Sequence, residues 1–338
     1  MTIQRLAVLD QSPIPEGSTP EQALARTVEL ARVTESLGYH RYWVAEHHGS
    51  QSFAGSAPEI LIGQIAASTR RIRVGSAGVM LMHYSPLKVA EWFKVLSAFH
   101  PGRIDLGIGR APGSDGITAA ALAYGSPLSV EYFPTKMSDL KAWLADAPPF
   151  TEAFARVTAT PHVARGPDLW MLGSSEDGAR LAAHFGLPFS YAHFINPDHA
   201  ERACAVYREN FRPSSELPEP LVSLGVFVLC ADSDAKAETL AGARDLWRLR
   251  VERGEFGPFP SPETVARYVP TAEETARIES RRKHQILGTP DRVKAHLEDL
   301  AEATGAGELA VVSITHDFAD RVRCYELLAE AFGLATPP

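Results

Sequence analysis

The chain has 338 residues, of which 45% are hydrophobic and 22% are charged, and its formal net charge is −8. This composition predicts a globular protein of one large domain or two ordinary ones, and the lysines and arginines form no long basic run of the kind that nucleic-acid binders carry. The N-terminus lacks the apolar core of a signal peptide, no segment approaches transmembrane length, and the three cysteines include no C-x-x-C pair. We therefore expect a protein of the reducing cytoplasm that binds neither nucleic acid nor membrane.

Short apolar runs alternate with amphipathic stretches along most of the chain. Near-continuous apolar runs are typical of strands that are covered on both faces, as in parallel sheets. Eight such runs predict strands at residues 6–9, 42–45, 72–77, 104–109, 169–172, 188–194, 222–230 and 309–314. Helical periodicity lies between them, for example at 20–37 before Gly38 and at 177–185 before Gly186.

Eight strands alternating with helices predict an α/β fold, a single (β/α)8 TIM barrel over residues 1–338. A doubly wound sheet is the alternative. Residues 111–167, after the fourth strand, and 232–288, after the seventh, do not fit the simple repeat and are predicted insertions. Long segments of this kind form a lid or binding loops in some proteins and passive surface in others, and the sequence leaves both interpretations open.

The run Glu46-His47-His48 follows the second predicted strand. Imidazole titrates near neutral pH, so a histidine at a strand end can give or take a proton. Successive strand residues point to opposite faces, so His47 and His48 cannot share a metal while the strand lasts, and the H-E-x-x-H pattern of zinc proteases is absent. We predict one functional histidine, one structural partner and no metal site.

The turn Gly173-Ser174-Ser175 links a predicted strand to a helix and is the candidate phosphate site. Free N–H groups and the helix dipole at such a turn favour an anion. Arg110, at the end of the fourth strand, could add a guanidinium. The alternatives are an ordinary helix cap by Ser175 or Asp177, and pairing of Arg110 with Asp105 or Asp115.

Small residues at 75–78 interrupt the third strand. They would let a flat ligand lie against the backbone, or they mark a bulge with tight barrel packing. A complete dinucleotide fingerprint and a Walker lysine are both absent. If the protein is a redox enzyme, we expect its electrons on a diffusible carrier.

Several of these segments together resemble the bacterial luciferase-like flavin-dependent monooxygenase family. The resemblance runs through nearly the whole chain, and the order and spacing of its segments carry it. The segments are residues 42–48 (YWVAEHH), 74–81 (VGSAGVML), 100–110 (HPGRIDLGIGR), 173–175, 182–188 and 288–290.

The resemblance implies a TIM barrel that binds reduced FMN, supplied by a separate flavin reductase, and activates O2. Through a C4a-peroxyflavin, one oxygen atom would be transferred to a small organic substrate. His47 matches the family's catalytic histidine.

The resemblance also implies the cofactor-binding residues. Gly173, Ser174 and Ser175 match the phosphate turn, and Arg110 is a second phosphate contact. Three further residues complete the set. Ala77 and Gly78 match a non-proline cis peptide that supports the flavin ring, and His193 is where relatives have a flavin-contacting tryptophan.

We do not expect this protein to emit light, because light-emitting luciferases have a cysteine where this chain has Gly109. An F420-dependent oxidoreductase that transfers hydride without oxygen is the alternative, and a non-catalytic flavin-binding protein is a third hypothesis. Family members commonly form dimers, so a homodimer is expected.

Overall fold

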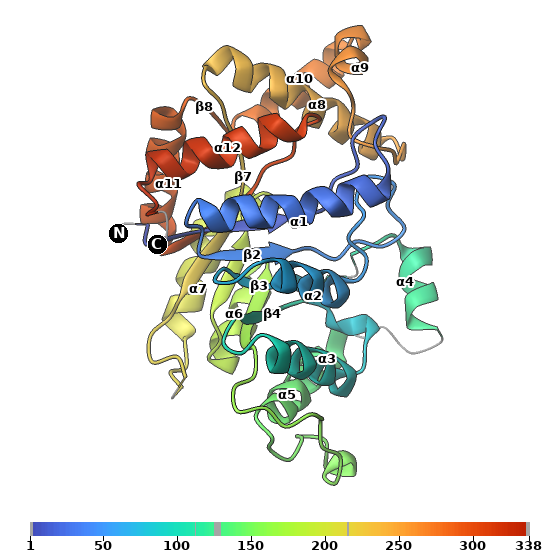
Figure 1. Ribbon diagram of the computed structural model, residues 1–338, viewed down its shortest axis with the longest axis vertical. Coiled ribbons are helices and arrows are strands. Elements are labelled where there is room, and N and C mark those ends of the chain that lie inside the picture. Colours follow the sequence, from blue (N-terminus) through green and yellow to red (C-terminus); the bar gives the residue numbers. More distant parts are fainter. Residues whose placement is uncertain (1–2, 112, 125–129, 215, 336–338) are drawn as a thin grey trace.

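Eight parallel strands form a closed barrel in the computed structural model, which describes residues 3–111, 113–124, 130–214 and 216–335 (Figure 1). Pairing of β6 with β7, β7 with β9 and β9 with β1 closes the ring. The barrel strands are β1 (Arg5–Asp10), β2 (Arg41–Val44), β3 (Arg73–Met80), β4 (Ile104–Gly109), β5 (Asp168–Gly173), β6 (Phe189–Ala192), β7 (Val222–Cys230) and β9 (Glu308–Val312). The closure confirms the TIM barrel and excludes the doubly wound sheet.

Helices cover the outside of the barrel, and α1, α2 and α3 are seen there in Figure 1. Local signals fix their ends: Thr19 and Gln22 form a capping box at the start of α1, and Gly305, at φ 67°, ends α11 in the left-handed conformation. The covering helices are α1 (Pro20–Ser36), α2 (Pro58–Ser68), α3 (Pro86–Phe99), α5 (Phe133–Leu144), α6 (Glu176–Phe185), α7 (Ala200–Asn210), α11 (Pro290–Thr304) and α12 (Phe318–Ala331).

The two segments that break the simple repeat contain regular elements. Residues 111–167 carry α4 (Gly116–Ala123), two 3-10 turns (Val130–Tyr132 and Glu152–Phe154) and α5, which packs on α3 as a barrel helix. Residues 232–288 carry α8 (Asp234–Glu252), α9 (Pro262–Arg267), α10 (Ala272–Arg282) and β8 (Ile286–Gly288). In Figure 1 these three helices lie together at the top of the view, and α8 contacts β7 and β8. The sequence analysis missed β8, which extends only the end of β7.

Alternation along each strand separates two apolar clusters. Ala7 on β1 and Trp43 on β2 join a cluster inside the barrel, whereas their neighbours Val8 and Tyr42 pack under the outer helices. Both faces of each strand are therefore buried, which explains the uninterrupted apolar runs in the sequence.

A buried carboxylate, Asp105 on β4, binds two strands from inside the barrel. Its oxygens lie 2.6 Å from Arg41 Nη1 on β2 and 2.5 Å from Arg73 Nη2 on β3. The indole N–H of Trp43 donates to the same carboxylate over 2.9 Å. Asp105 is fully buried, so removing its charge would leave two guanidinium groups without their shared partner.

The ion network continues from the two arginines to other strands. Arg41 also pairs with Glu308 on β9 at 3.0 Å, and Arg73 pairs with Asp168 on β5 at 2.6 Å. Five of the eight barrel strands are thus connected by charge at the end of the barrel opposite the carboxyl ends of the strands.

We predict that Asp105→Asn lowers the free energy of unfolding by about 3–5 kcal/mol, because it removes the buried charge that both guanidinium groups contact and leaves each with a single carboxylate partner. Chemical denaturation followed by circular dichroism measures the change. Glu91→Gln, which breaks the surface pair with Lys88 at 3.6 Å, is the matched control and should cost about 1 kcal/mol or less. Equal costs for the two variants would contradict a structural role for the network.

Candidate active site

Glu46 fixes the end of β2 against the end of β3. Val44 pairs with Ser76, so the residues that follow the two strands lie side by side. The buried Glu46 carboxylate accepts hydrogen bonds from the Met80 N–H (3.0 Å) and the Tyr84 hydroxyl (2.8 Å). Burial, and next the charge of Glu46, raise the pKa of Tyr84. Glu46 therefore acts as an anchor for the loop that carries the two histidines.

His48 makes contacts through both its ring and its backbone. Its Nε2 lies 2.7 Å from Glu46 Oε1, and its backbone N–H donates to the Gly113 carbonyl. The ring also meets the His83 ring edge-on, with centroids 6.0 Å apart. These contacts fix the position of His48, and its Nε2 is engaged in the contact with Glu46.

His47 has a different environment. Its backbone N–H donates to the Gly55 carbonyl, but the ring nitrogen Nδ1 is buried and has no hydrogen-bond partner among the described residues. The ring stacks on Phe53 with centroids 4.6 Å apart. Burial lowers the pKa of His47 to about 4, although the nearby Glu46 opposes the shift. The imidazole is therefore neutral at pH 7, with one nitrogen able to donate a hydrogen bond and the other to accept one.

The Ala77–Gly78 peptide bond is cis, at the position where the family resemblance predicts one. The register of β3 with β4 shifts between Ser76 and Val79, so the strand is irregular here. A Cβ at Gly78 would lie 2.7 Å from the Gly107 carbonyl oxygen, which explains the glycine by close strand packing. The sequence allows two interpretations of these small residues, a surface for a flat ligand or a bulge with tight packing. The structure contains the irregularity that the second interpretation predicts. The contact with a ring system remains a prediction.

The structure brings Arg110 to the candidate phosphate turn. Its Nη2 lies 3.9 Å from Asp177 in the first turn of α6, a long contact that leaves most of the guanidinium without a partner among the described residues. Neither Asp105 nor Asp115, the two partners considered from sequence, pairs with it. Ser175 is the N-cap of α6 and accepts from the Gly178 N–H, as the cap interpretation predicts.

The other residues of the turn are arranged around this cap. The Ser174 carbonyl accepts hydrogen bonds from Tyr191 and Asn196, while the Ser174 hydroxyl has no partner in the part of the chain that the structure describes. Gly173 ends β5 beside Gly178. The turn therefore presents a free hydroxyl, a helix N-terminus and the Arg110 guanidinium together.

His193 does not join this group. The chain turns after β6, and the charges that act on the buried His193 ring are those of His296, His284 and Asp198. The next residue, Phe194, instead packs over Gly225 of β7 and joins the cluster inside the barrel. The aromatic side chain at this corner of the barrel is therefore Phe194, which the sequence analysis did not single out.

Helix α8 supplies further residues that sequence patterns did not reveal. Trp247 meets Phe53 edge-on with centroids 5.7 Å apart and donates its indole N–H to Ser52 over 2.9 Å. Since Phe53 stacks on His47, α8 borders the site. No local signal could have placed it there, because the contact joins residues almost 200 positions apart in the sequence.

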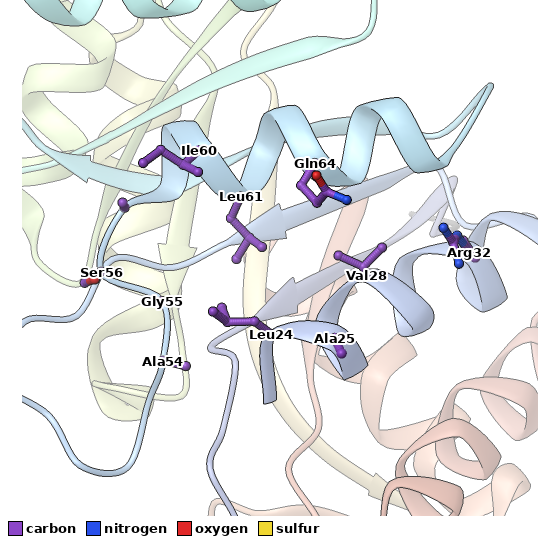
Figure 2. A pocket seen from close by; sticks show the side chains of 11 residues that line it. Leu24, Ala25, Val28, Arg32, Ala54, Gly55, Ser56, Ile60, Leu61 and Gln64 are labelled. Atoms are coloured by element: carbon purple, nitrogen blue, oxygen red, sulfur yellow. The ribbon is translucent and has the colours of Figure 1, made fainter. Parts of the chain in front are cut away.

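An apolar groove of about 570 Å³ lies outside the barrel, between α1 and α2 (Figure 2). Its walls include Leu24 and Val28 from α1, and Ile60 and Leu61 from α2. Gly55 connects the groove to the His47 loop, because its carbonyl accepts the His47 N–H. None of the predicted site residues lines this groove, so it is separate from the candidate active site.

Two further searches concern metals and membranes. Among the described residues, no three or more His, Cys, Asp and Glu side chains gather so that they could hold a metal ion. None of the described helices is both long and apolar enough to cross a bilayer.

A family model described as luciferase-like monooxygenase matches residues 4–307. The chain belongs to this family. An N-acetyl-S-alkylcysteine monooxygenase of Bacillus subtilis (strain 168) is 36% identical over 329 residues, which are 97% of this chain and 98% of that protein. The crystal structure of apo-MsnO8 is 42% identical, has a TM-score of 0.90, and is matched over 98% of this chain and 99% of that one.

A more distant structure shares the fold. The oxygenating constituent of 3,6-diketocamphane monooxygenase from Pseudomonas putida, in complex with FMN, is 21% identical with a TM-score of 0.71, over 97% of each chain.

The neutral state of His47 predicts a pH dependence of stability. An unfolded histidine has a pKa near 6.5, so between about pH 6.5 and 4 the unfolded chain binds a proton that folded His47 does not. Stability should therefore fall as the pH falls through this window. In His47→Gln, the free energy of unfolding should decrease between pH 7 and 4.5 by about 2 kcal/mol less than in the wild type. Denaturation series at several pH values measure this, and parallel curves for the two proteins would contradict a buried neutral His47.

Proposed function

We propose that this protein is an FMN-dependent monooxygenase that transfers one oxygen atom of O2 to a small organic substrate. The other oxygen atom leaves as water, and the reduced flavin supplies the two electrons. The observation that carries the proposal is His47, a buried imidazole with an unpaired nitrogen at the barrel mouth of a chain in the luciferase-like monooxygenase family. The relative that oxidises N-acetyl-S-alkylcysteines makes this compound class the first substrate to test.

The residues at the β5–α6 turn fit the phosphate of FMN. Arg110 has only one long contact, the Ser174 hydroxyl is free of described partners, and the N-terminus of α6 favours an anion. Ala77 and Gly78, next to the strand end that carries His47, are proposed to support the ring system. FMN, when bound in reduced form, supplies the chemistry that activates oxygen.

His47 is proposed to hold or move a proton beside the reacting centre. With a pKa of about 4 it remains neutral, so its unpaired Nδ1 can accept a hydrogen bond or, in the other tautomer, donate one. Phe53 holds the ring by stacking and keeps water from that face. Glu46 does not compete for the proton on His47 because its oxygens bind Met80, Tyr84 and His48.

A separate flavin reductase as the source of reduced FMN, a homodimer, and a lid formed by residues 111–167 or 232–288 remain predictions. The family is one of monooxygenases, which favours FMN over F420, since F420 transfers hydride without oxygen. Anaerobic titration with reduced FMN and with reduced F420, followed by admission of air, separates the two cofactors. Oxygen consumption with F420 absent supports the proposal; hydride transfer from F420 alone contradicts it.

We predict that His47→Ala lowers the rate of oxygenation by about 100-fold or more, because proton transfer by a positioned side chain contributes that much. The FMN dissociation constant should change little. The measurement is incorporation of ¹⁸O from ¹⁸O2 into N-acetyl-S-methylcysteine, with photoreduced FMN. His162→Ala, at a surface histidine paired with Asp146, is the control and should react like the wild type. Full activity of His47→Ala would refute its assignment.

We also predict that Arg110→Gln weakens FMN binding by about 10–100-fold, because it removes charged hydrogen bonds to the phosphate. Riboflavin, which lacks the phosphate, should bind the variant and the wild type equally. Fluorescence titration measures both affinities. An equal loss for FMN and riboflavin would show that Arg110 acts on the ring or on the fold.

A further inference from the structure

Two arginines on α8, Arg244 and Arg248, have no hydrogen bond or ion pair with any residue that the structure describes. The Arg244 guanidinium instead lies over the Phe227 ring, 3.7 Å from its centroid. Both side chains are partly buried. Burial, and next the charge of Arg248, lower the pKa of Arg244 to about 9, and burial also lowers the pKa of Arg248. Both groups remain cationic at neutral pH, so this part of the molecule holds positive charge without a counterion.

The neighbouring carboxylates do not neutralise this charge. Asp245 binds Arg282 at 2.6 Å and Gln285 at 3.1 Å, and Glu252 binds Arg277 and Arg281. A third arginine, Arg281, contributes to this charge: its Nη1 is buried and has no hydrogen-bond partner among the described residues. Like charges at positions i and i+4 of a helix repel each other, so the placement of Arg244 and Arg248 is unfavourable unless an anion binds there.

The two arginines lie on the face of α8 that borders the site. Positions 244, 247 and 248 share one helix face, and Trp247 meets Phe53, which stacks on His47. Phe227, under Arg244, belongs to the cluster inside the barrel. Arg244 therefore lies against the cluster inside the barrel. Two aromatic contacts, Trp247 with Phe53 and Phe53 with His47, connect this face of α8 with the imidazole.

This position is separate from the proposed phosphate site, because Phe227, under Arg244, is on β7, and β6 lies between β7 and β5. The second half of α8 contacts the loops after β1 and β2, through Arg250 with Glu16 and Trp247 with Ser52. In the eight-strand order, β1 is opposite β5 and β9 is opposite β4. Arg110 and Ser174 follow β4 and β5, so one site can hold the cofactor phosphate while the other holds a second anion.

We infer that Arg244 and Arg248 bind a carboxylate of the organic substrate, so that this enzyme oxygenates carboxylate-bearing molecules. This inference rests on the proposed function and adds the substrate class to it. Guanidinium groups bind carboxylates through paired hydrogen bonds, and an apolar wall such as Phe227 suits the carbon skeleton next to the anion.

Calorimetric titration of the FMN-loaded protein with benzoate and benzamide tests the inference, because the two probes share a shape and differ in charge. The wild type should bind benzoate about 10-fold or more tightly than benzamide. Arg244→Gln and Arg248→Gln should each weaken benzoate binding by about 10-fold and leave benzamide unchanged. Arg244→Lys keeps the charge but loses the planar guanidinium with its paired N–H donors, so it should bind benzoate with intermediate affinity. Arg292→Gln, at an exposed arginine of α11, should match the wild type.

Equal affinity of the wild type for benzoate and benzamide would overturn the inference. A loss of benzoate affinity in Arg292→Gln as large as in Arg244→Gln would also overturn it. The variants are also titrated with FMN and riboflavin. If Arg244→Gln weakens FMN but not riboflavin, these arginines hold the cofactor phosphate and the inference is wrong. Benzoate binding needs neither reduced flavin nor oxygen, so its outcome is separate from that of the oxygenation experiment.

Discussion

The barrel depends on one buried carboxylate, Asp105, which binds Arg41 and Arg73 on the two preceding strands. Asp105 is fully buried, so the geometry of these contacts constrains the spacing and register of the strands. The arginines extend the same constraint to Glu308 and Asp168. Four of these strands, β2 to β5, carry the candidate site residues at or after their other ends, so the network helps to determine where those residues lie.

A second carboxylate, Glu46, repeats this arrangement at the barrel mouth. It binds the Met80 N–H of β3, the Tyr84 hydroxyl and His48, and so fixes the backbone on both sides of His47. The His47 ring can therefore remain without a hydrogen-bond partner and still have a defined position. The two histidines thus differ: His48 contacts the Glu46 carboxylate, and Nδ1 of His47 has no partner among the described residues.

The sequence predicted the barrel because parallel strands are buried on both faces, and that burial leaves a continuous apolar run. It missed β8, which has only three residues and no such run. It anticipated the Ser175 cap from local chemistry, but not the contact of Arg110 with Asp177, which depends on how β4 and α6 meet. The position of Arg244 over Phe227 could not be predicted, because a helical arginine without a visible partner is usually exposed.

Arginines provide positive charge at two separate places, and His47 belongs to neither of them. Arg110 is at the β5–α6 turn, while Arg244 and Arg248 are on α8. Anions held at both sides would leave the region around His47 without a formal charge of its own, since burial keeps the imidazole neutral. A neutral, poorly hydrated centre between two anchored anionic groups suits oxygen transfer, because water and stray protons are excluded where the reaction occurs. The arginines and the neutral His47 would thus serve the same reaction from different positions.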